Sequence, residues 1–115
     1  MTDLEKVIYP FVYPELRGKD WEMLTGWPTY NVAFVGAQPW CVLPVLYIHG
    51  KYNANFLMHE IEPRLAKQGV TVHYRGIDCH TVHPKEGQWC LINQDGCVGL
   101  GSDPMKAVGE YLGVN

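Results

Sequence analysis

The residues best suited to chemistry lie in one short polar stretch, Asp78 to His83, which holds a thiol and two imidazoles. Cys79 and His83 are both of a type that ligates metal ions, and Cys90 and Cys97 follow downstream. A closed zinc site needs four ligands at defined spacings, however, and the chain contains no CxxC or HxxxH pair. We therefore predict a polar loop here, with no bound metal and no cofactor.

The same stretch permits a second chemistry, nucleophilic attack by a thiolate. His80 follows Cys79 directly, and a histidine activates a cysteine when the two side chains meet in space. Neighbours in sequence need not meet, and a third, orienting group is normally required. A small metal- or thiol-dependent hydrolase that uses Cys79, His80 and His83 is therefore the alternative hypothesis.

The leading hypothesis is a binding surface built from Arg75, His73 and Trp89. Arg75 offers a permanent charge with planar donors, and His73 offers a charge that changes near neutral pH. Trp89 adds a ring for stacking, so the set suits a nucleotide, a phosphate or an acidic protein surface. The competing interpretation is a second apolar face covered by the aromatic residues of the N-terminal third. We expect the strand faces that point away from the core to carry Thr71, His73 and Arg75 on one strand and Trp89, Leu91 and Asn93 on the next.

A hairpin near the C-terminus must position Trp89. A three-residue loop with Gly96 in the left-handed region pairs Ile92 with Val98 and Cys90 with Leu100. That register brings the four apolar side chains onto one face, whereas a slip of one residue mixes the faces. We therefore predict that these four residues point into the core together.

Signals for helix starts lie near both ends of the chain. Thr2 and Glu5 have capping-box spacing, so a short helix is expected from Asp3, with Pro10 ending it. Asp20 is the expected cap of a second short helix, Trp21 to Thr25. Near the other terminus, Asp103 is the expected cap of a last helix, which begins with Pro104 and has an apolar stripe of Met105, Val108 and Leu112.

The middle of the chain reads as strand, strand, helix. Tyr30 to Val35 and Trp40 to His49 form an antiparallel pair, in which Pro44 demands a sheet edge or a bulge. Asn55 is the expected cap of the longest helix, which ends before Gly69 and leaves Phe56 on its outer side. Its apolar stripe is Leu57, Met58, Ile61 and Leu65. These elements predict an α+β fold, a mainly antiparallel sheet of about five strands with helices packed on one face.

Length, composition and charge indicate the number of domains and the classes of partner. The 115 residues predict one domain, 1–115, and 47% hydrophobic with 18% charged residues is typical of a globular protein. A formal net charge of -3 argues against non-specific nucleic-acid binding, and no apolar stretch is long enough for a membrane span. The first residues resemble no secretion signal, so we expect a cytoplasmic protein whose four cysteines are reduced, with Cys90 and Cys97 pointing apart and no disulfide.

The C-terminal two-thirds resembles small phage-encoded α–β–α sandwich proteins. The resemblance rests on a pattern of elements: the helix from Asn55 to Gln68, a strand that ends near Arg75, the tryptophan strand from Gln88 to Ile92, and the segment from Gly101 to Val108 that opens the last helix. The N-terminal third departs from the pattern by two extra strands. The resemblance implies a phage accessory protein, and such proteins often block host defences by binding a defence protein or a signalling nucleotide.

The sequence thus favours a non-enzymatic binding protein that inhibits or sequesters a host factor, and the resemblance implies that it is encoded by a phage. The expected partner is a host protein or a small nucleotide, bound through Arg75, His73 and Trp89 in the host cytoplasm. The sequence leaves room for a homo-oligomer.

Overall fold

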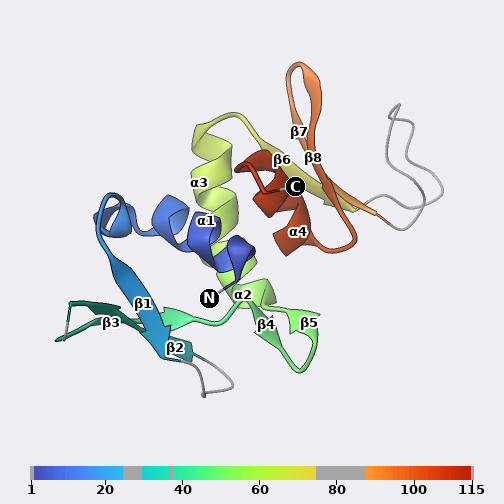
Figure 1. Cartoon of the computed structure of the whole chain (residues 1–115). Helices are drawn as coiled ribbons and strands as arrows, with labels where there is room; N and C mark the ends of the chain where they lie inside the picture. Colours follow the sequence, from blue (N-terminus) through green and yellow to red (C-terminus); the bar gives the residue numbers. More distant parts are fainter. Residues whose placement is uncertain (1, 25–29, 37, 75–87, 115) are drawn as a thin grey trace.

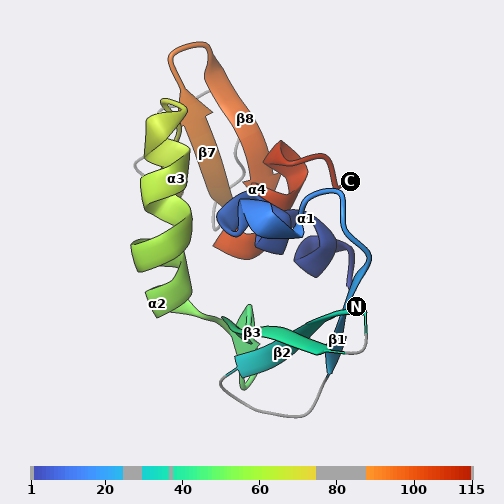
Figure 2. The ribbon, with the colours of Figure 1, turned by 90° about the vertical axis from the view of Figure 1, so that its left-hand side faces the viewer.

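The fold is described by a computed structural model for residues 2–24, 30–36, 38–74 and 88–114. The predicted α+β class and the antiparallel pairing are confirmed, but the single five-stranded sheet is wrong. The described strands form three separate antiparallel sheets, with orders β1-β2-β3, β4-β5 and β6-β7-β8. Helix α1 (Asp3–Val12) lies between the two larger sheets (Figures 1 and 2).

Helix α1 begins as predicted and ends later. The Thr2 hydroxyl accepts a hydrogen bond from the Glu5 backbone N–H at 3.3 Å, and the Glu5 carboxylate accepts one from the Thr2 backbone N–H at 2.8 Å. Pro10 does not end the helix, because Phe11 and Val12 beyond it are buried and hold the last turn in place. A short 3-10 helix, η1 (Pro14–Leu16), follows.

The segment from Trp21 is a strand rather than the predicted short helix. Strand β1 (Trp21–Leu24) pairs with β2 (Tyr30–Val35), and the Trp21 ring meets the Tyr9 ring edge-on, with the centroids 6.2 Å apart. Sheet pairing and this aromatic contact outweigh the capping signal of Asp20, which illustrates how tertiary context overrides local propensity.

The second predicted strand is divided at Pro44. Strand β3 (Gln38–Pro44) pairs with β2 at the edge of its sheet, as Pro44 demands, and its bulge lies further back, between Pro39 and Cys41. The chain then forms a separate small hairpin of β4 (Tyr47–Ile48) and β5 (Lys51–Tyr52). Its turn has positive φ at both His49 (52°) and Gly50 (79°), the conformation that matches the twist of a two-residue hairpin.

The longest helical region contains a π-helical segment. It runs through α2 (Ala54–Phe56), η2 (Leu57–Ile61) and α3 (Glu62–Lys67), and Asn53 caps it in place of the predicted Asn55. Pro63 has no N–H to donate to the carbonyl four residues earlier. This missing hydrogen bond is a physical reason for the wider π turn just before it.

The π segment also corrects the predicted apolar stripe. Leu57, Ile61 and Leu65 are buried as predicted, but Met58 is 56% exposed and Phe56, expected on the outer side, is 2% exposed. A π turn adds a residue to the helix, so the regular 100° spacing used for the prediction fails across it.

The third sheet comprises β6 (Thr71–Tyr74), β7 (Trp89–Asn93) and β8 (Gly96–Gly101). Cys90 is opposite Leu100 as predicted. Ile92 is opposite Cys97 rather than Val98, because the register shifts at a bulge after Leu91 and the turn has two residues, Gln94 and Asp95.

The side of the hairpin that faces the core is also not the predicted one. Leu91 is fully buried and belongs to the core, whereas Ile92 is only half-buried. Gly99, opposite Leu91, lies against α4 (Pro104–Tyr111) so closely that an added Cβ would stand 2.5 Å from the Ala107 carbonyl oxygen. The face that meets the helix is therefore the one with glycines, which an apolar pattern does not reveal.

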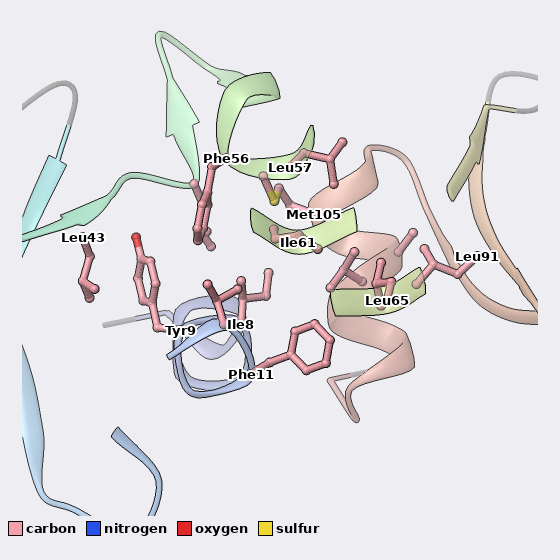
Figure 3. Packing of buried hydrophobic residues seen from close by; sticks show 14 of the residues in the cluster. Ile8, Tyr9, Phe11, Leu43, Phe56, Leu57, Ile61, Leu65, Leu91 and Met105 are labelled. Carbon is pink, nitrogen blue, oxygen red and sulfur yellow. The ribbon is translucent and has the colours of Figure 1, made fainter. Parts of the chain in front are cut away.

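The core gathers around α1, as Figure 3 shows. Ile8 and Tyr9 of α1 are both fully buried, and the Tyr9 ring lies 6.0 Å from the Phe56 ring between centroids. The Tyr9 hydroxyl donates to the Pro44 carbonyl oxygen at 2.6 Å. The core cluster also includes residues from β3, from the helical region η2–α3, from β7 and from α4: Leu43, Ile61, Leu65, Leu91, Met105 and Val108.

Burial of adjacent hairpin residues gives the first testable prediction. Leu91→Ala should lower the free energy of unfolding by about 2–5 kcal/mol because it leaves a cavity in the core. Ile92→Ala, its matched neighbour on the other face, should cost less. Urea denaturation of both variants checks this order, and a larger loss for Ile92→Ala would contradict the described register.

Candidate ligand site

The predicted binding residues do not converge. His73 is opposite Cys90 and Trp89 is opposite Tyr74, so His73 and Trp89 point to opposite faces of the sheet. His73 is exposed, and its Nε2 lies 2.9 Å from the Thr71 hydroxyl. The predicted common surface for His73 and Trp89 is therefore wrong, and Arg75 lies outside the described residues.

Trp89 belongs to an aromatic cluster against the core. Its ring lies 5.4 Å from Tyr52 and 5.2 Å from Tyr74 between centroids, at interplanar angles of 72° and 57°. The Tyr52 ring meets Trp89 edge to face and the Tyr74 ring is tilted against it, so these three rings form no flat platform for stacking. The cluster joins the β4-β5 hairpin to the third sheet, which is a structural role for Trp89.

The residues of the alternative hypothesis, Cys79, His80 and His83, also lie outside the described residues. The thiol of Cys90 is buried and that of Cys97 is half-buried. Their predicted separation onto opposite faces fails, because Cys97 is opposite Ile92, which shares a face with Cys90. In the described part of the chain, no three histidine, cysteine or acidic residues are grouped to hold a metal ion.

The structure instead presents a cavity of about 460 Å³ where two helices begin. We call it the cap cavity, because Thr2 and Asp103, the N-caps of α1 and α4, both line it. The β4-β5 hairpin forms another wall. The lining residues are Thr2, Leu4, Glu5, Asn31, Val45, Leu46, Tyr47, Gly50, Asp103 and Lys106.

A tyrosine–aspartate pair fixes the hairpin wall of the cap cavity. The Tyr47 hydroxyl donates to the Asp103 carboxylate, at 2.9 Å to Oδ2 and 3.0 Å to Oδ1. Asp103 also accepts from the Lys106 backbone N–H at 2.9 Å, the N-cap bond of α4. Burial, together with the carboxylate that accepts its proton, raises the pKa of Tyr47 well above its ordinary value.

The inner end of the cavity is mostly apolar. Val45 and Leu46 are buried there, and Asn53 holds both in place: its Nδ2 donates to the Val45 carbonyl oxygen and its backbone N–H donates to that of Leu46, each at 2.8 Å. Asn31 is the polar exception, with 7% of its surface exposed. Its Nδ2 donates to the Tyr9 hydroxyl at 3.2 Å.

Sequence reasoning missed this site, although it placed three of its lining residues correctly in helix caps: Thr2, Glu5 and Asp103. One signal was available: Asn31 shares a strand face with Ala33, so a polar residue stands among core positions. Tyr47 carried no such signal, because it lies 56 positions before Asp103 and only the fold brings the two together.

No protein-family model, curated protein or solved structure matches the chain. In the described residues, no helix has the length and apolar character that crossing a membrane requires. The resemblance to phage proteins thus stays a proposal.

The Tyr47–Asp103 pair predicts a loss of stability in alkali. The folded protein keeps Tyr47 protonated above pH 10, where an unfolded tyrosine ionises, so the stability that it contributes is complete below about pH 10 and falls as the pH rises further. Tyr47→Phe has no proton to lose there, so its unfolding free energy should fall less steeply between pH 9.5 and 11.5. Denaturant titrations at several pH values measure this difference.

Asp103→Asn is the matched control for that experiment. Asparagine also caps helices well, so α4 should persist, while the carboxylate that holds the Tyr47 proton is gone. Its alkaline profile should lie between those of the wild type and Tyr47→Phe. Superimposable profiles for the wild type and Tyr47→Phe would show that the pair contributes no pH dependence.

Proposed function

We propose that the protein is a non-enzymatic binding protein that holds a small molecule in the cap cavity. The observation that carries the proposal is the cavity itself, at about 460 Å³ within the range of small-ligand sites and walled by helix starts and a hairpin. These walls are tied by the Tyr47–Asp103 bonds and by the Asn53 contacts to Val45 and Leu46, so the site is preorganised.

The chemistry of the lining favours binding over catalysis. General acid–base catalysis is most efficient when the pKa of the group lies near the working pH. The raised pKa of Tyr47 moves it away from that range and leaves it a neutral hydrogen-bonding group. Asp103 is occupied as a cap and as the acceptor for Tyr47. Such groups can orient a ligand without transferring a proton.

The identity of the partner is a finer proposal. A phage accessory protein that sequesters a host factor is supported by the sequence resemblance alone. Of the two host factors considered, a small nucleotide and a defence protein, the cavity favours the small molecule, because its volume suits a ligand of that size.

Capture from a host lysate tests this function. The tagged protein should retain a small molecule that is released on denaturation and identified by mass spectrometry, with co-captured proteins analysed in the same sample. Lys106→Trp places a bulky ring at the rim of the cap cavity and should reduce the retained ligand by at least about tenfold, since a blocked cavity loses most of the buried contact area.

Lys67→Trp is the matched control, because Lys67 is exposed at the end of α3, does not line the cavity and carries the same change of side chain. It should retain ligand as the wild type does. Equal retention by Lys106→Trp and the wild type would place any ligand outside the cap cavity, and a protein partner without a small molecule would contradict the proposal.

A further inference from the structure

We infer that the cap cavity selects an uncharged small molecule that donates an N–H hydrogen bond to Asn31. This inference rests on the proposed function and specifies the chemistry of the ligand. It starts from a buried polar side chain, Asn31, whose hydrogen bonds to the described residues use only part of its capacity.

The neighbouring tyrosine fixes the orientation of the Asn31 amide. The single hydroxyl proton of Tyr9 is donated to the Pro44 carbonyl oxygen at 2.6 Å, so its oxygen acts as an acceptor toward Asn31. The amide group at 3.2 Å must therefore be Nδ2, and Oδ1 is turned away from Tyr9. Among the described residues, none donates a hydrogen bond to this Oδ1.

A buried carbonyl oxygen without a donor is unfavourable, so a ligand that supplies one is favoured over an isostere that does not. Asn31 lines the cavity beside Leu4, Val45 and Leu46, which are apolar. The matching ligand therefore has a compact apolar or planar body with an N–H group at one end. The remaining Nδ2 hydrogen of Asn31 favours an acceptor next to that donor.

The charges at the rim argue for an uncharged ligand. Among the described residues that line the cavity, Glu5 and Asp103 are acidic and Lys106 is basic, so negative charge is in excess. The Lys106 Nζ donates to the Ser102 hydroxyl at 3.2 Å, which engages that one cation. An anionic ligand would meet net repulsion, whereas a carboxamide or an aminated heterocycle brings a donor and an acceptor without charge.

Pairs of probes that differ in the N–H group test the inference by NMR titration of the full chain. Nicotinamide and nicotinate share a ring, but only the amide offers a donor and no charge. Adenosine and purine riboside share a base frame, but only adenosine has an amino group. Nicotinamide should bind at least about tenfold more tightly than nicotinate if carboxamides are the ligand source, and adenosine should exceed purine riboside by a similar factor if aminated bases are.

Two variants separate ligand binding from folding. Asn31→Leu keeps a similar volume and should abolish the preference for adenosine over purine riboside, which differ in no charge. It should reduce the preference for nicotinamide over nicotinate to the part that the acidic rim causes. Tyr9→Phe removes the hydroxyl that orients the amide but leaves Oδ1, so it should weaken the preference without abolishing it, while its stability falls. Should Asn31→Leu fail to fold, shifts of the wild-type Asn31 side-chain amide on titration give the same information.

The outcomes distinguish this inference from the proposed function. Equal affinities within both pairs, binding of no probe, or a preference that Asn31→Leu leaves undiminished would overturn the inference. If a different small molecule is then retained from lysate and lost in Lys106→Trp, the proposed function stands without it. If nothing sensitive to Lys106→Trp is retained, both fail.

Discussion

The hydroxyl of Tyr9 links helix α1 to the first sheet, β1-β2-β3. It donates to the last carbonyl oxygen of β3 at Pro44 and accepts from Asn31 of β2, while its ring contacts Trp21 of β1 and Phe56 of α2. The first sheet extends away from the helices, and the chain measures 50 Å along its longest axis against 24 Å along its shortest (Figure 2). A sheet placed in this way is held by few contacts, so this buried hydrogen-bonded ring has a disproportionate effect on where it sits.

The cap cavity is a consequence of that arrangement. Tyr9 brings β2, and with it Asn31, to the start of α1, while the Tyr47–Asp103 bonds bring the β4-β5 hairpin to the start of α4. Neither helix start forms the cavity alone, and their capping groups are already used within the protein. What remains for a ligand is an apolar inner wall with one buried amide, which recognises shape and hydrogen bonding more than charge.

The parts that could be predicted from sequence are those governed by local chemistry. The capping box of Thr2 and Glu5 and the cap at Asp103 were correct, because a helix start is decided by a few neighbouring residues. The prediction placed Met58 in the core and Phe56 on the surface, and the structure shows the reverse, because a π turn alters the helical period that the prediction assumed. The cavity was out of reach, since Asn31, Tyr47 and Asp103 meet only through the tertiary fold.

Two of the three glycines of β8, Gly99 and Gly101, restrict how this chain can change over evolution. An added Cβ at Gly99 or Gly101 would lie 2.5 Å from the backbone of α4 at Ala107, so any side chain there displaces the helix. Asp103 moves with that helix, and the wall of the cap cavity moves with Asp103. Substitutions at these two positions are therefore selected against, although neither residue lines the cavity. Lys106 at the exposed rim carries no such constraint, so substitutions there can change which ligand the cavity accepts.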